Sequence, residues 1–147
     1  MLVSSHVLAG ALIGRALSRH PLGAFAAGVV SHLAMDSCPH WGIPDRSDPQ
    51  LFMRVARCDG CAGLAAMAVS AGLSPARSRR AVLAAMAGGA LPDLDKPMLH
   101  FFGLDPFPAA FTAFHKRIQD EAPHRLPHEV AVAAALAVAA FAVLARS

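Results

Sequence analysis

The chain contains no tyrosine and few runs of β-branched residues, so it offers little of what β-strands favour. Charged residues are also scarce: they make up 16% of the sequence, whereas soluble domains usually carry about a quarter. Hydrophobic residues fill 55% of the chain, and its mean hydropathy is +0.45. These deficits argue against a sheet protein. They indicate an all-α protein that is either tightly packed in water or embedded in a membrane.

Cysteine is too rare to build a disulfide framework, because the chain has three. Cys58 and Cys61 form a C-x-x-C pair and Cys38 stands apart, so a four-cysteine zinc site is impossible. A disulfide or plain buried thiols fit them better than a mixed cysteine–histidine site. The net charge of +3 is modest, and the arginines do not form a stripe with interleaved aromatic residues. We therefore expect no nucleic-acid partner.

No apolar run reaches the roughly 20 residues of a full transmembrane helix. Shorter apolar segments of helical composition cover residues 4–18, 22–37, 61–73, 81–91 and 128–145. We expect one helical domain over residues 1–147, with loop-rich connections at 39–57 and 92–127, the second of which contains one amphipathic helix near 109–120. The predicted fold is all-α, an antiparallel bundle of about five hydrophobic helices with the metal-ligand residues gathered at one end.

The stretch from Ser31 to Gly42 carries an unusual spacing, in which His32, Asp36 and His40 recur every four residues. Residues i and i+4 share one face of a helix, so His32 and Asp36 are placed to bind one metal ion. Pro39 ends the helix, which puts His40 in the turn beyond it, close to the other two. Each residue alone is more simply a charged helix end or a half-buried histidine. The metal hypothesis therefore depends on further ligands reaching the same place.

Antiparallel segments would separate the arginines from the candidate ligands. One end of the bundle receives Arg15, Arg19, Arg77, Arg79, Arg80 and Arg146. The other end receives seven of the eight histidines, with His20 as the exception. This segregation is typical of a membrane protein that follows the positive-inside rule, with its site facing away from the cytoplasm. A soluble bundle with one functional end would show the same pattern.

Imidazoles and carboxylates at the histidine-rich end are ligands that Zn²⁺ takes and that Mn²⁺ or Fe²⁺ also accepts. The predicted metal ligands are His6, His32, Asp36, His40, Asp93, His115 and His128. This set exceeds what one tetrahedral ion needs. It suggests two divalent ions, or one ion with additional carboxylates that orient the histidines.

Two acidic residues are candidates for the catalytic proton acceptor. Asp95 follows Asp93 in a loop directly after an apolar segment, where both acids alternatively solvate the loop or cap a helix. Glu129 begins the last segment, where it serves as a general base or as a favourable charge at a helix N-terminus. Lys116 and Arg117 either hold an anionic substrate such as a phosphate or form a solvated turn.

Four short motifs occur together in the chain: His6-x-x-x-Gly10, His32-Leu-Ala-Met-Asp36, Gly89-Ala-Leu-Pro-Asp93-Leu-Asp95 and His115-Lys-Arg. Together they resemble those of the predicted membrane-bound metal-dependent hydrolase family. That family is similar in turn to the all-α zinc-dependent phospholipase C group, which also uses a His-x-x-x-Asp helix. In this chain the His-x-x-x-Asp helix precedes the acidic motif, whereas in the family it usually follows. The resemblance implies several hydrophobic helices and metal-assisted hydrolysis.

The candidate ligands and the charge segregation, taken with this resemblance, predict a membrane-associated, metal-dependent hydrolase that acts on a phosphoester or lipid-type ester. A bound metal, with zinc the first choice, would lower the pKa of a water molecule so that hydroxide attacks the substrate. The alternative is a non-catalytic membrane protein that binds metal for structure or sensing. A third interpretation is a helical membrane scaffold without metal. An open coordination position beside a pocket favours catalysis, and a closed site favours the structural interpretation.

Overall fold

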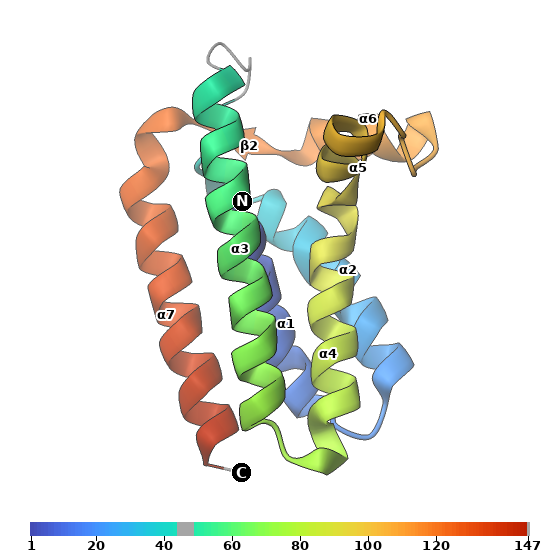
Figure 1. The fold of residues 1–147 in the computed structure, drawn as a ribbon, viewed down its shortest axis with the longest axis vertical. Coiled ribbons are helices and arrows are strands. Elements are labelled where there is room, and N and C mark those ends of the chain that lie inside the picture. The colour runs from blue at the N-terminus through green and yellow to red at the C-terminus, as the bar shows by residue number, and fades with distance from the viewer. Residues whose placement is uncertain (44–48, 147) are drawn as a thin grey trace.

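A computed structural model describes residues 1–43 and 49–146 (Figure 1). Across these residues the protein is all-α, as predicted, apart from two strands of two residues each. The helices are α1 (Val3–Ala16), α2 (Pro21–Asp36), α3 (Pro49–Leu73), α4 (Ala76–Ala90), α5 (Asp95–Phe102), α6 (Ala109–Ile118) and α7 (Leu126–Ala145). The shorter elements are the 3₁₀ helices η1 (Leu91–Leu94) and η2 (Pro123–Arg125) and the strands β1 (Pro39–His40) and β2 (Asp120–Glu121).

The long helices run alternately up and down, so that their turns fall at two opposite ends (Figure 1). The α1–α2 turn, the α3–α4 turn and the C-terminal end of α7 lie at the lower end in this view. The short helices α5 and α6 lie across the upper end. Helix α1 is central because it contacts α2, α3, α4 and α7. This arrangement places the arginine-rich turns and the segments that carry the candidate ligands at opposite ends of the molecule.

The core lies where α1, α4 and α7 meet. Its buried residues are Val7, Leu8, Ala11, Val82, Met86, Ala140 and Leu144. Burying a side chain the size of leucine or methionine stabilises the fold by about 1.5–3 kcal/mol. Helices α2 and α4 approach so closely that a Cβ atom on Gly28 or Gly88 would overlap a carbonyl oxygen of the other helix. Gly28 and Gly88 therefore allow α2 and α4 to pack closely.

Two predicted loops contain helix. Helix α3 begins at Pro49, so the expectation of a loop over 49–57 was wrong, and residues 44–48 lie outside the described part of the chain. Proline is well suited to the first position of a helix, and Arg54 and Arg57 are good helix formers although they interrupt the apolar pattern. The connection at 92–127 contains α6, which confirms the helix expected near 109–120, and also η1, α5 and η2, which were not expected.

Two further expectations need correction. Cys38, Cys58 and Cys61 are free and exposed, so they are neither disulfide-bonded nor buried. Strands β1 and β2 pair in parallel, with His40 opposite Glu121, although the composition argued against any sheet. This short pairing joins two distant segments beside the histidine-rich end.

Much apolar surface is exposed around the described helices, including Leu22, Leu64 and Val138, which are 87%, 68% and 72% exposed. One helical stretch, Pro123–Ala145, is long and apolar enough to cross a membrane, and 17% of its most apolar 18-residue segment is buried. By length and composition, this helix is therefore the candidate membrane span among the described residues.

Candidate metal centre

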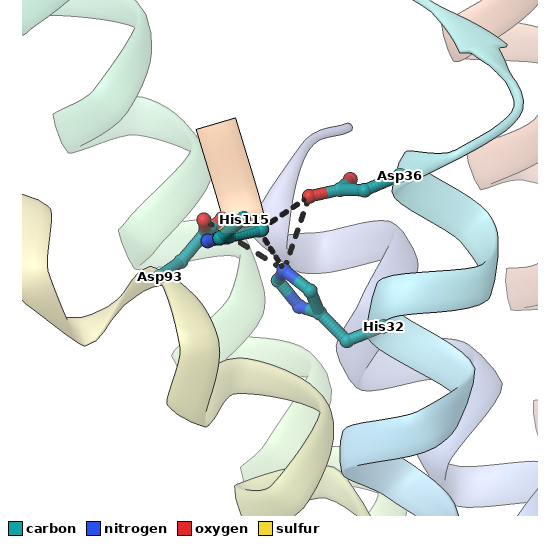
Figure 2. A group of neighbouring side chains, drawn as sticks. All are labelled: His32, Asp36, Asp93 and His115. Carbon is teal, nitrogen blue, oxygen red and sulfur yellow. Dashed lines mark hydrogen bonds and ion pairs between the residues drawn. The ribbon is translucent and has the colours of Figure 1, made fainter. Parts of the chain in front are cut away.

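Four side chains converge at the upper end of the bundle. His32 and Asp36 come from α2, Asp93 from η1 and His115 from α6 (Figure 2). Each offers one ligand atom, and these atoms all lie within 4.8 Å of one another. All four side chains are buried, Asp93 being the most exposed at 8%. This buried group of two imidazoles and two carboxylates has the chemistry to hold a divalent metal ion.

Helix α2 presents its histidine and aspartate as the spacing predicted. His32 Nε2 lies 3.1 Å from Asp36 Oδ2, one helical turn further on. The helix ends at Asp36, and its C-cap Ser37 precedes Pro39 by two residues. His40 then lies in β1 and is also buried. The end of α2 therefore holds His32 and Asp36, and the segment beyond it brings His40 Nε2 to 4.0 Å from Asp36 Oδ1.

The tautomer of His32 follows from its contact with Gly89. His32 Nδ1 lies 2.6 Å from the Gly89 carbonyl oxygen, which only accepts hydrogen bonds, so Nδ1 carries a hydrogen and donates. In the neutral ring, Nε2 then presents a lone pair to Asp36 Oδ2 and to His115 Nε2, each 3.1 Å away. A lone pair facing a carboxylate is repulsive unless a proton or a metal cation lies between them. Metal-ligating histidines usually donate their other N–H in this way.

His115 completes the group from α6. Its Nε2 atom lies 2.9 Å from Asp36 Oδ2. Gln119, one turn further along the same polypeptide, donates from Nε2 to the same oxygen across 3.1 Å. Lys116 and Arg117 are exposed. The end of α6 thus directs one imidazole and one amide at a single carboxylate oxygen.

Asp93 is held by a neighbouring cation. Lys96 donates from Nζ to Asp93 Oδ1 across 2.7 Å, and His32 Nε2 lies 3.8 Å from the same oxygen. Burial alone would raise the pKa of Asp93, but the Lys96 ammonium and the nearby histidines outweigh it and hold that pKa below its ordinary value. Asp93 therefore offers an ionised carboxylate, the form that a metal binds.

A second set of groups surrounds the other oxygen of Asp36. His6 Nε2 lies 3.1 Å from Asp36 Oδ1, and the N-terminal ammonium of Met1 lies 2.7 Å from it. His40 Nε2 lies 4.0 Å from this oxygen and 3.7 Å from Glu121 Oε1. The His40 imidazole holds the pKa of Glu121 below its ordinary value, although burial opposes it.

His40 repeats the arrangement of His32. Its Nδ1 donates to the Cys38 carbonyl oxygen across 2.8 Å, which again leaves the Nε2 lone pair directed elsewhere. Among the described residues, His40 Nε2 is buried without a hydrogen-bond partner, and so is His6 Nδ1. The rings of His6 and His32 stack with their centroids 3.8 Å apart. Buried polar atoms without partners are uncommon in folded proteins, and a bound ion is one way to satisfy them.

The remaining predicted site residues lie apart from the four-residue group. Glu129 is 2% exposed and accepts hydrogen bonds from Leu2 N, Ser5 Oγ and Trp41 N at 2.9, 3.3 and 3.3 Å. Its carboxylate thus ties the start of α7 to the start of α1. A role for Glu129 as proton acceptor stays a prediction.

His128 and Asp95 occupy more open positions. His128 is exposed, because successive helical residues point about 100° apart and Glu129 takes the inward position. The structure therefore does not bring His128 to the ligand group. Asp95 is partly exposed at the start of α5, where its Oδ1 accepts a hydrogen bond from Lys96 N at 2.8 Å.

Sequence reasoning missed Lys96, Gln119 and Glu121 as parts of this site. Gln119 was detectable, because it follows His115 by four residues. Glu121 was not, because its position depends on the pairing of β1 with β2. No protein-family profile, curated protein or solved structure matches the chain. The interpretation of the site therefore rests on its own geometry.

Proposed function

We propose that the chain is a membrane-associated protein that binds a divalent metal ion through His32, Asp36, Asp93 and His115. The observation that carries this proposal is the convergence of four buried ligand atoms within 4.8 Å of one another, with His32 Nδ1 engaged by the Gly89 carbonyl so that Nε2 faces Asp36 and His115. A cation among these atoms would turn mutual repulsion into ligation. Two imidazoles and two carboxylates suit zinc first, and Mn²⁺ or Fe²⁺ would also accept them.

The same reasoning supports a second ion in the site. Its ligands would be Asp36 Oδ1, His6, His40 and Glu121, of which His40 has an unpartnered Nε2 atom. Asp36 would then contribute to the ligand sets of both ions. The imidazole nitrogens of His6 and His40 lie 3.1 and 4.0 Å from Asp36 Oδ1, whereas those of His115 and His32 lie 2.9 and 3.1 Å from Oδ2. The Met1 ammonium also lies 2.7 Å from Oδ1, so we propose that the second ion binds more weakly.

Membrane association is supported by the surface rather than by the site. Apolar side chains are exposed on α2, α3 and α7, and the helical stretch that includes α7 is long and apolar enough to span a membrane. By the positive-inside rule, the arginine-rich end would face the cytoplasm and the metal centre would face away from it.

Hydrolysis of a phosphoester or lipid-type ester is the catalytic form of the proposal. The metal would supply a bound water acidic enough to lose a proton near neutral pH. Asp95, partly exposed and two residues from Asp93, is the better-placed proton acceptor, because the oxygens of Glu129 already accept three hydrogen bonds. Lys96, which touches Asp93, adds a positive charge that would attract an anionic substrate.

The non-catalytic alternative is favoured by the burial of the ligands. None of the four is more than 8% exposed, which is typical of a closed structural site rather than of one that admits substrate. The metal would then stabilise the upper end of the bundle or report metal availability.

A substrate screen separates the two forms. Purified protein in neutral detergent, loaded with zinc, would be assayed against a generic phosphodiester and a generic carboxylester. Catalysis predicts turnover that is lost in Asp36→Asn and kept in the matched exposed variant His128→Gln. Metal binding with no turnover of either ester would overturn the hydrolase and leave the structural or sensing role.

A further inference from the structure

Among the described residues, the end of the molecule opposite the metal centre carries arginines and no side-chain carboxylates. All ten acidic residues of the chain lie within 36–59 and 93–129. The α1–α2 turn, the α3–α4 turn and the end of α7, which lie at the lower end in Figure 1, belong to the segments 1–35, 60–92 and 130–146, which contain arginines and no aspartate or glutamate.

Three of these arginines surround one cavity. Arg15, Ser18, Arg19 and Arg77 line a cleft of about 140 Å³. They come from the last turn of α1, the α1–α2 turn and the first turn of α4. The three cations therefore converge although two of them lie about sixty residues from the third in the sequence. Such convergence differs from a scatter of solvated surface charges.

Neighbouring arginines are engaged differently. Arg79 donates to the carbonyl oxygens of Ala71 and Ser74 across 2.9 and 3.1 Å, so it caps the end of α3. Arg80 and Arg146 are exposed and do not line the cleft. Arg15, Arg19 and Arg77 thus line the cleft, whereas the other arginines at this end do not.

We propose that this cleft binds a phosphate group. Guanidinium groups present paired N–H donors that match the oxygens of a phosphate, and Ser18 adds a hydroxyl donor. The N-terminus of α4, a 15-residue helix, adds its positive dipole end beside Arg77. The phosphate comes either from the headgroup of an anionic lipid or from a soluble phosphate compound. The site lies at the end opposite His32 and Asp36, so it does not depend on the proposed metal function.

The test measures phosphate binding by full-length protein in neutral detergent. One titration uses inorganic phosphate and the other uses a short-chain phosphatidic acid, with affinity read by calorimetry. The cleft variant Arg19→Gln/Arg77→Gln is compared with Arg80→Gln/Arg146→Gln, which removes the same charge from the same end. All four of these residues are exposed, and thermal unfolding and metal content are measured first to show that each variant is folded.

The expected result is saturable binding of at least one ligand by the wild type. The cleft variant should lose affinity roughly tenfold or more, since it loses charge-assisted hydrogen bonds, while the control loses about twofold or less. The tighter ligand identifies the source of the phosphate. Equal losses in the two double variants would show diffuse charge alone and overturn the proposal. So would binding lost in Asp36→Asn but kept in the cleft variant, because that phosphate would lie at the metal centre.

Discussion

His32 Nδ1 lies 2.6 Å from the carbonyl oxygen of Gly89, a residue 57 positions further along the chain. Gly89 also lies against α1, since a Cβ atom there would come 2.7 Å from the His6 carbonyl oxygen. Gly89 therefore lets α4 approach α1, and its carbonyl oxygen fixes the orientation of the His32 imidazole, which comes from α2. Close helix packing and the chemistry of the site are joined at this residue.

Gly89→Ala should lower the free energy of unfolding by about 1–3 kcal/mol, because the added methyl group has no room beside α1. The matched control is Gly72→Ala on α3, where an added Cβ meets nothing within 4 Å. That change should be neutral or stabilise by up to about 1 kcal/mol. Denaturant unfolding in detergent measures both. Equal effects of the two substitutions would contradict the packing described for Gly89.

Asp59→Ala should destabilise the protein by about 1–2 kcal/mol. The N-cap residue of α1, Leu2, provides no side-chain cap, and Asp59 of α3 takes that role. Its oxygens accept hydrogen bonds from Val3 N at 2.6 Å and from Ser4 N and Oγ at 3.2 and 2.5 Å. Asp105→Ala, at an exposed position, should cost less than about 0.5 kcal/mol. A comparable loss in both variants would argue against this capping.

Asp59 should also shape the pH dependence of stability. Burial raises its pKa above the ordinary value of 3.8, so between that value and the raised pKa the folded chain holds more protons than the unfolded chain. The contribution of Asp59 to stability therefore falls as pH rises through this window. Asp59→Asn should remove that component. The measurement is the unfolding free energy of the wild type minus that of the variant, taken at increasing pH from about 3.5. This difference should fall as the pH rises. A difference that grows with rising pH would contradict the expected sign.

His115→Ala should lower the amount of bound zinc, because its Nε2 atom faces Asp36 and His32. His128→Ala should leave it unchanged, because that imidazole is exposed and outside the ligand group. Removing one of four ligands usually costs far more affinity than removing a distant imidazole. Zinc is measured by competition with a coloured chelator. Equal losses in the two variants would place His128 in the site, as the sequence alone suggested.

The helical class and much of the site could be predicted from the sequence. Apolar segments marked the long helices, and antiparallel order brought His6, Asp93 and His115 towards His32 and Asp36. The periodic spacing on α2 was decisive, because helix geometry places residues four apart on one face. Antiparallel order placed the arginines at the opposite end without any knowledge of contacts.

The rest depended on tertiary contacts that leave no periodic signal. The first turns of α3 were predicted to be a loop, because their polar residues interrupt the apolar pattern from which the helices were predicted. The inward position of Glu129 rather than His128 is set by the hydrogen bonds it accepts from Leu2, Ser5 and Trp41. Glu121 joins the site through a two-residue strand pairing that composition argued against.

The most direct test of the account is the metal content of protein purified in detergent without added metal. Elemental analysis of wild type and Asp36→Asn, a nearly isosteric change, would be compared at equal protein concentration after both are shown to be folded. The account predicts at least about one divalent ion per chain in the wild type and a large loss in the variant. A wild type that carries no stoichiometric metal, even after incubation with zinc, would contradict it.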